Sequence, residues 1–450
     1  MIDDTKADSN RLSLTDQSPQ KWLKRDWIFC VGIIVVTVFT SCLHIRAYPT
    51  LSPLDELQHI DYAKRAGRFD IPAVGERVQQ QTLAEAACRS VDAPGYISPT
   101  CNAPVQNPDN FQERGFNTAA SQFPTYYIVT GLLARGVMQI TPIGSAVTSL
   151  RVVSGIWLGI ALCILWYVLA LMNVSRRHRI NSFLLIISTP LIIFTSSTVT
   201  PDSMLFLVGS VLLLTAIKYE ADKLKWYFFL PIVCLAFSID RAVFLPILVI
   251  FIYLFLKIFA MRELNYRKLV VFLSIPIVLY VMYFKIYPYI QTHLAPSTLS
   301  AAEAPMNGKN QTAGVDSDRL LQQIETVVSP IWNVYIPHTL NTDLTRALKS
   351  LYNWFIIGAL FALSLKGYAR KGWAIMSGGT LAVMVLAGPM YSFYYAYFSN
   401  ADYSAPGRFG LGLLPVAVIA TSVVVTKTTS YVLASVLAMF SYSYLLWLLL

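Results

Sequence analysis

The segment Trp27–Leu43, WIFCVGIIVVTVFTSCL, carries no charge and is long enough to cross a bilayer as a helix. Lys21, Lys24 and Arg25 precede it, and no small-residue cleavage site follows it. We therefore expect a retained signal anchor rather than a cleaved signal peptide. Because basic residues collect on the cytoplasmic side of membrane helices, residues 1–26 are expected to form a disordered cytoplasmic tail.

The composition extends this expectation to the whole chain. Hydrophobic residues make up 55% of the 450 residues and charged residues only 13%, and the mean hydropathy is +0.53. The apolar runs are separated by short basic turns and do not alternate with polar residues, which excludes a transmembrane barrel. The sequence predicts an all-α polytopic membrane protein. The net charge of +10 comes from clusters at the ends of apolar runs, so we read these as topology determinants and expect no nucleic-acid partner.

One apolar segment decides the topology. Residues 123–133, FPTYYIVTGLL, are short for a span and are followed by Arg135 and Pro142. If they lie on the membrane as an interfacial helix, the cluster Arg176–Arg179 faces the cytoplasm, as do the later basic clusters. That choice leaves eleven expected spans, at about 27–43, 151–172, 181–198, 202–218, 225–239, 242–259, 268–287, 350–366, 372–390, 409–426 and 430–449.

These spans divide the chain into the following parts. A transmembrane module covers 27–287 and includes an extracytoplasmic loop at 46–150. A second extracytoplasmic loop covers 288–349, and the C-terminal helices cover 350–450.

The first loop begins with the motif SPLDELQHIDY at residues 52–62. Ser52 suits a helix N-cap and Pro53 the first turn, which would place Asp55, His59 and Tyr62 on one helical face. A carboxylate at a membrane surface can deprotonate a hydroxyl, while Glu56 beside it could position a substrate or a divalent cation. Asp55 also fits a merely structural role in the first turn, facing the helix dipole.

The cysteines fall into two groups. Cys30, Cys42, Cys163 and Cys234 lie in apolar spans, whereas Cys88 and Cys101 share the first polar loop. If that loop faces an oxidising compartment, the two would pair and stabilise it by about 3 kcal/mol. Two free thiols are the alternative.

Three further charged residues lie at the ends of spans on the same expected face. Arg241 could bind a phosphate or simply pair with Asp240. Arg408 follows a tyrosine-rich run and suits either an interfacial snorkelling role or a head-group contact. Asp202 could cap its helix or add an acid to the site.

Together these elements resemble the GT-C class of glycosyltransferases, which includes protein O-mannosyltransferases and lipid A aminoarabinose transferases. The resemblance rests on Asp55-Glu56 after the first span, the helix at Pro124-Thr125-Tyr126-Tyr127, and Arg151 leading into the next span. The form Pro53-x-Asp-Glu-x-x-His59 is most similar to a broad, uncharacterised bacterial membrane-protein family. Thr200-Pro201-Asp202 and Arg408-Phe409 with Leu414-Pro415 also fit. Gln122-Phe123-Pro124 departs from the Lys-Pro-Pro run of the aminoarabinose transferases.

The resemblance implies an inverting transferase of the bacterial cytoplasmic membrane, with its active site on the extracytoplasmic side. It would move a sugar from a polyprenyl-phosphate donor to a cell-envelope acceptor such as a lipid-linked glycan, an O-antigen, another polysaccharide or a protein. Asp55 would be the base, Glu56 and His59 would orient the acceptor, and Arg241 and Arg408 would stabilise the leaving phosphate. Asp202, Tyr62 and Tyr126 would contact substrate. Adjacent carboxylates permit Mg²⁺ or Mn²⁺ without requiring it.

Two other functional classes stay open. A transporter or flippase for lipid-linked sugars would need charged or broken helices near the bilayer middle. A polysaccharide polymerase or ligase would place its key arginines in a late loop, where this chain has Arg319 and Arg346.

Overall fold

The computed structural model describes residues 24–450 except 94–95, 173, 222, 261–264, 287–288, 290–341, 367–370, 400–405 and 425–427. The described part is helical, and its only extended pairings are two isolated bridges, Leu51 with Val91 and Arg77 with Phe116. Residues 1–23 of the expected tail and Arg319 lie outside the described residues, as does most of the expected second loop, whereas residues 24–26 belong to the first helix.

The N-terminal half contains α1 (Lys24–Ala47), α2 (Glu56–Ala66), α3 (Gln80–Arg89), the short helices η2 (Pro108–Asn110), η3 (Gln112–Gly115) and η4 (Thr118–Ser121), α4 (Thr125–Ile140), α5 (Ala146–Leu171), α6 (Arg176–Ile187), α7 (Pro190–Thr195), η5 (Pro201–Met204) and α8 (Leu205–Glu220). The C-terminal half contains α9 (Trp226–Phe237), η6 (Arg241–Val243), α10 (Phe244–Phe255), η7 (Leu256–Ala260), α11 (Tyr266–Val281), η8 (Met282–Ile286), α14 (Asp343–Lys366), α15 (Lys371–Ser399), η10 (Gly407–Leu413), α16 (Leu414–Val424) and α17 (Thr428–Leu449).

Eight helical segments of the described chain are long and apolar enough to cross a membrane: Asp26–Ala47, Ala146–Leu171, Pro201–Tyr219, Arg241–Phe259, Asp343–Leu365, Gly372–Phe393, Gly407–Val424 and Val432–Leu449. They correspond to eight of the eleven expected spans, so the chain is an all-α protein of the multi-pass membrane type. The helix that includes the expected span 350–366 begins earlier, at Asp343, within the segment expected to be loop.

The other three expected spans form shorter helices. Residues 181–198 are divided between α6 and α7, because the helix stops at Ser188 and Thr189 and restarts with Pro190 in its first turn. The α9 helix has 12 residues, and α11 has 16 before it continues as a π-helical turn. Both contain an internal proline, which removes a backbone hydrogen bond. The count of eleven stays a prediction.

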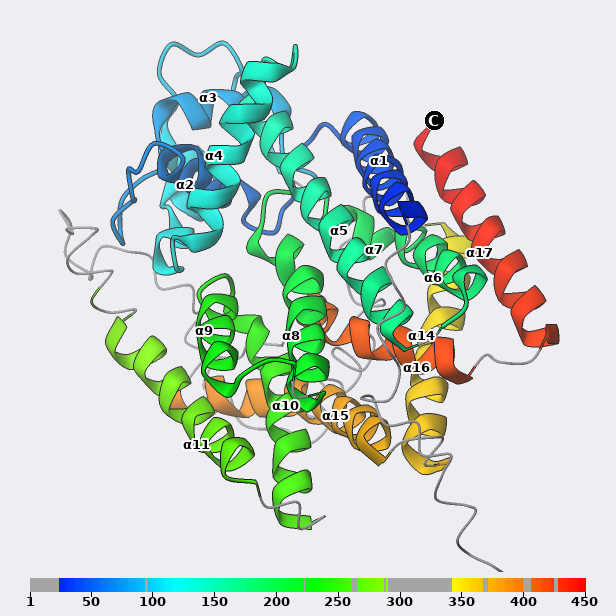
Figure 1. The fold of residues 1–450 in the computed structure, drawn as a ribbon. Helices are drawn as coiled ribbons and strands as arrows, with labels where there is room; N and C mark the ends of the chain where they lie inside the picture. Colours follow the sequence, from blue (N-terminus) through cyan, green and yellow to red (C-terminus); the bar gives the residue numbers. More distant parts are fainter. Residues whose placement is uncertain are drawn as a thin grey trace, which may run out of the picture.

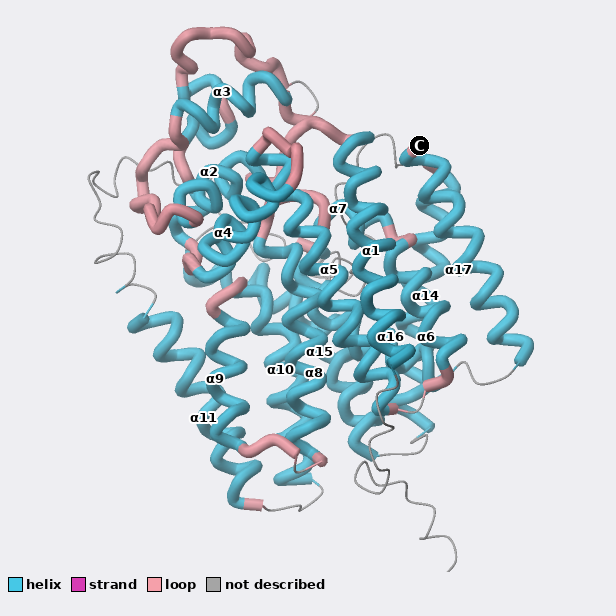
Figure 2. Tube along the Cα trace, turned by 45° about the horizontal axis from the view of Figure 1, so that its top comes forward, coloured by secondary structure: helices cyan, strands magenta, loops and turns pink. Residues whose placement is uncertain are grey.

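The helices pack around α5 and α8, whose membrane-length windows are 72% and 83% buried, against 22% for α17 at the periphery. α5 contacts α1, α4 and α8, while α10 packs on α15 and α14 on α15 and α16. Figures 1 and 2 show α2, α3 and α4 gathered at one end of this bundle. Their position places the first long loop over the ends of the spans.

The first loop has its own framework. α2 packs closely on α4, where a Cβ at Gly131 would lie 2.1 Å from the Ala63 carbonyl oxygen. A disulfide joins Cys88 and Cys101, the two loop cysteines expected to pair. The α4 helix has 16 residues, about 24 Å at 1.5 Å per residue, which is shorter than the hydrocarbon core of a bilayer.

Candidate functional site

A cavity of about 290 Å³ lies where the first loop meets the ends of several spans. Its charged and polar lining comes from segments that are far apart in the sequence. The lining residues are Asp55, His59, Ser121, Gln122, Phe123, Thr200, Pro201, Asp202, Ile239, Asp240, Arg241, Ala242, Phe244, Leu245, Ala387, Tyr391, Arg408 and Phe409. Five of the residues expected in the site therefore lie together: Asp55, His59, Asp202, Arg241 and Arg408.

Asp55 occupies the N-cap position of α2, with the left-handed backbone angle φ = 57°. The helix begins at Glu56, so the prediction that Ser52 caps it and Pro53 opens it was wrong. Residues 53–55 instead form a turn, in which the Ser52 hydroxyl accepts a hydrogen bond from the Leu54 amide at 3.2 Å. The side chain of Asp55 makes no capping hydrogen bond, which leaves its carboxylate to the cavity.

Burial raises the pKa of Asp55 above its usual range, and the nearby Glu113 carboxylate adds to this, while Arg408 opposes it. Desolvation of a carboxylate disfavours its charged form. A raised pKa makes the carboxylate a stronger base, because a general base works best when its pKa approaches the working pH.

His59 is held in place by a series of hydrogen bonds to side chains outside α2. Its Nδ1 lies 2.8 Å from the Tyr127 hydroxyl, which donates to Gln122 Oε1 at 2.7 Å. Because that hydroxyl has one proton and gives it to Gln122, the His59 Nδ1 must carry a proton and Nε2 is the acceptor of the ring. Burial lowers the pKa of His59 to about 4, so the imidazole is neutral at neutral pH.

Asp202 and Arg408 form an ion pair across the cavity, between Asp202 Oδ2 and Arg408 Nε. The capping role considered for Asp202 belongs to Thr200, whose hydroxyl accepts from the Asp202 amide and donates to its carboxylate at 3.2 Å. The guanidinium of Arg408 also lies 5.8 Å from the centre of the Phe409 ring. Arg408 is thus fixed within the protein, at 21% side-chain exposure.

Asp240 and Arg241 border the same cavity. The Asp240 carboxylate caps η6 by accepting from the Ala242 amide at 2.5 Å, and burial, reinforced by the Asp202 charge, raises its pKa to about 7. Arg241 is exposed and donates to the Ser121 carbonyl at 2.8 Å, which joins η6 to the first loop. The geometry therefore presents Arg241 at the rim of the cavity.

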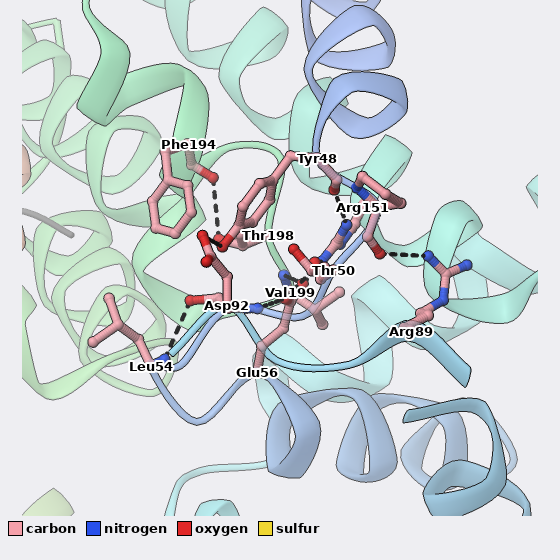
Figure 3. Close-up of polar contacts among 12 residues, drawn as sticks. Tyr48, Thr50, Leu54, Glu56, Arg89, Asp92, Arg151, Phe194, Thr198 and Val199 are labelled. Atoms are coloured by element: carbon pink, nitrogen blue, oxygen red, sulfur yellow. Dashed lines mark hydrogen bonds and ion pairs between the residues drawn. The ribbon is translucent and has the colours of Figure 1, made fainter. Parts of the chain in front are cut away.

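Glu56 points elsewhere, although it follows Asp55 directly. Figure 3 shows its carboxylate meeting Arg151, whose guanidinium also donates to the carbonyls of Tyr48 and Thr50. The amides of Ser52 and Val199 donate to the same carboxylate at 2.7 and 3.0 Å. Glu56 does not line the cavity, and its hydrogen bonds tie the end of α1, the start of α2, α5 and the segment before η5 to one another.

Tyr62 and Tyr126 are also buried beside the cavity rather than in its lining. The Tyr62 ring stacks on Tyr127 with centroids 3.8 Å apart, and Tyr126 meets Tyr127 edge to face at 5.1 Å. Both residues therefore support Tyr127, and through it His59.

The adjacent carboxylates do not converge on a common point that could hold a cation. Both oxygens of Glu56 are engaged by Arg151 and backbone amides, away from the cavity that Asp55 lines. Among the described residues no group of three or more His, Cys, Asp or Glu side chains is arranged to bind a metal. The motif thus does not fit the divalent-cation site that Asp55 and Glu56 were thought able to form.

Sequence reasoning missed several members of the site. Gln122 was considered only as a departure from a Lys-Pro-Pro run, and Tyr127 only as part of an apolar segment and of the run Pro124-Thr125-Tyr126-Tyr127. Yet these two residues determine which ring nitrogen of His59 carries the proton. Asp240 was considered only as a partner for Arg241. The signal available was weak: a polar glutamine directly before Phe123-Pro124, and paired tyrosines in the first turn of a helix.

Comparison with known proteins yields no assignment. No family model matches the chain, and neither the curated proteins nor the solved structures searched contain a significant match.

Proposed function

We propose that this protein is a membrane glycosyltransferase that moves a sugar from a polyprenyl-phosphate donor to an acceptor hydroxyl in the cavity lined by Asp55. The observation that carries the proposal is the meeting of an exposed, uncapped carboxylate with a neutral imidazole and two arginines at the ends of membrane-length helices. A long-chain lipid donor accounts for a polar cavity at the end of an apolar bundle.

In the proposed step, the acceptor oxygen attacks the anomeric carbon and forms the new glycosidic bond. The bond from that carbon to the donor phosphate oxygen breaks, and its electron pair leaves with the polyprenyl phosphate. Asp55 takes the proton that the acceptor hydroxyl loses, and His59 accepts a hydrogen bond from a substrate hydroxyl through Nε2. Attack opposite the leaving phosphate inverts the anomeric centre.

The two arginines of the cavity have different surroundings and are assigned different roles. Arg408 is paired with Asp202, whereas Arg241 is exposed at the rim. Arg241 is therefore the better candidate to bind the donor phosphate first. Arg408 then directs part of its guanidinium group toward the leaving phosphate. Tyr391 and Phe409, whose rings lie 6.0 Å apart, supply apolar faces of the kind that suit a sugar ring.

Glu56 takes a positioning role in this proposal in place of direct contact with the acceptor. Its pair with Arg151 fixes the residue next to Asp55. We also propose that the cavity faces the extracytoplasmic side of a bacterial cytoplasmic membrane, with the α6–α7, α9 and α11 segments counted as crossings. The basic clusters of the sequence support that orientation.

The test is transfer in proteoliposomes from a labelled polyprenyl-phosphate hexose to an extracted envelope acceptor. Asp55→Asn keeps the size of the side chain and removes its basicity, so we expect transfer to fall by at least about 100-fold, as for loss of a general base. Asp109→Asn is the matched control, since Asp109 is an exposed acid of the same loop. Transfer by Asp55→Asn at the wild-type rate would overturn the assignment.

The same proteoliposomes distinguish a transferase from a flippase. Movement of the labelled lipid between leaflets, with no sugar found on any acceptor, would favour a flippase over the transferase. Donor use should weaken in Arg241→Ala, seen as a higher KM for the donor, while KM for the acceptor stays unchanged.

A further inference from the structure

A second cavity, of about 420 Å³, shares no lining residue with the first. It is lined by residues of α2, α3, α4 and the start of α5. Its polar lining consists of Lys64, Arg68, Gln81, Glu85, Arg135, Gln139 and Ser145.

The charge of this cavity is positive. Lys64, Arg68 and Arg135 supply three cations, and Glu85 is the one carboxylate of the lining. That carboxylate already accepts a hydrogen bond from the Ser145 hydroxyl at 2.8 Å and lies only 3.7 Å from the Lys64 ammonium. Lys64 is 12% exposed, and burial lowers its pKa, so an added negative charge would be favourable here.

The start of α5 adds to the positive charge of this cavity. The cavity is lined by Gly144, Ser145 and Ala146, where the 26-residue helix α5 begins. The partial positive charge of a helix N-terminus adds to that of the three side chains. Arg135 is held in place because its Nη1 donates to the Gly67 carbonyl at 2.8 Å.

An apolar surface adjoins the cavity on α4. Val129, Leu132, Leu133 and Ile140 expose 40%, 40%, 43% and 83% of their surface, and Leu132 lies about one helical turn before the cavity-lining Arg135, at the edge shared by the two faces. Met138, exposed by 37%, belongs to the lining itself. An apolar face beside basic side chains is the pattern of a helix that lies at a membrane surface.

We infer that this second cavity binds the phosphate of an anionic membrane lipid, with Lys64, Arg68 and Arg135 around the head group and the acyl chains along the exposed face of α4. The charge of the cavity selects an anion, and the neighbouring apolar face selects a lipid over a free phosphate. This inference does not depend on the chemistry proposed for the first cavity.

The test compares thermal unfolding of the full chain in nanodiscs of phosphatidylcholine with and without phosphatidylglycerol. We expect phosphatidylglycerol to raise the melting temperature of the wild type and to have little effect on an Arg68→Gln, Arg135→Gln double variant. The Arg77→Gln control alters a cation of the same loop that pairs with Asp109 outside the cavity, and it should keep the full shift. Equal shifts in the wild type and the double variant would overturn the inference.

Two further measurements address a possible loss of stability in the double variant and the binding of a free anion. Arg68 is exposed, so Arg68→Gln alone should fold normally and show a reduced shift even if the double variant is unstable. Inorganic phosphate and glycerol phosphate, added to phosphatidylcholine discs, test the free anion. A shift with these anions and none with phosphatidylglycerol would overturn the assignment to a lipid.

Discussion

Arg151 Nη2 lies 2.8 Å from Glu56 Oε2, and neither side chain exposes more than 1% of its surface. A buried ion pair with both partners hydrogen-bonded is strongly destabilised when one partner is removed, because the other remains charged and unsolvated. We expect Arg151→Met to lower the free energy of unfolding by about 3–5 kcal/mol, measured by chemical denaturation in detergent.

Adding Glu56→Gln to Arg151→Met should recover part of that loss, since no uncompensated charge would remain. The exposed pair Asp343–Arg346 provides the control, and Arg346→Met should leave the denaturation midpoint unchanged. A single Arg151→Met variant as stable as the wild type would show that Glu56 finds another partner.

Gly131 sits where α4 touches α2. A methyl group there would lie 2.1 Å from the Ala63 carbonyl oxygen, so the two helices must separate to admit it. We expect Gly131→Ala to destabilise the protein by roughly 1–3 kcal/mol, as overpacking does, and to increase hydrogen exchange in α2. Gly136→Ala lies on the same helix with no atom within 4 Å of the added carbon, and it should be neutral or slightly stabilising.

Asp240 provides a pH-dependent test of burial. Its pKa is raised from 3.8 to about 7, so the folded state binds a proton more tightly than the unfolded state does. Its favourable contribution is therefore complete below about pH 4 and is lost as the pH rises through 7. Asp240→Asn, which can still cap η6, should differ least from the wild type in melting temperature at pH 4 and exceed it by several degrees more at pH 8.5. A difference that is constant across this range would contradict the raised pKa.

Tyr127 connects His59 to Gln122. Tyr127→Phe removes the hydroxyl that holds the His59 proton on Nδ1, while keeping the stack with Tyr62. In the transfer assay we expect about a tenfold lower kcat, the scale of one lost hydrogen bond, with an altered pH profile. Tyr62→Phe loses the 3.3 Å contact to the Gln122 carbonyl but not the stack on Tyr127, and it should keep the wild-type profile. Identical profiles for both variants would remove Tyr127 from the positioning of His59.

The sequence predicted the features that depend on local pattern. Membrane-length helices follow from uninterrupted apolar runs, and eight of the expected eleven have the length and composition to cross a membrane. The α6–α7 interruption was missed because Ser188-Thr189-Pro190 lies within an apolar run. Hydropathy averages over such a break, whereas the proline restarts the helix.

The sequence predicted only those site residues that lie close together in the chain or at the same end of the expected spans. Asp55 and His59 lie near each other in the chain, and Arg241, Asp202 and Arg408 could be grouped by topology. The role of Glu56 could not be predicted, because Arg151 lies 95 residues away. The start of α2 was misplaced since the left-handed conformation of Asp55 has no clear signal in a non-glycine residue.

The ion pair between Asp202 and Arg408 joins residues 206 positions apart, which matters while the chain is being made. Asp202, in η5 directly before α8, is synthesised long before Arg408. An incomplete chain therefore holds an acid at the head of a span with no counter-ion from η10, and the cavity closes only when the last helices insert. Assembly of the site is thereby tied to completion of synthesis, so a chain truncated before residue 408 would carry every segment of the first loop and still lack the cation that Asp202 requires.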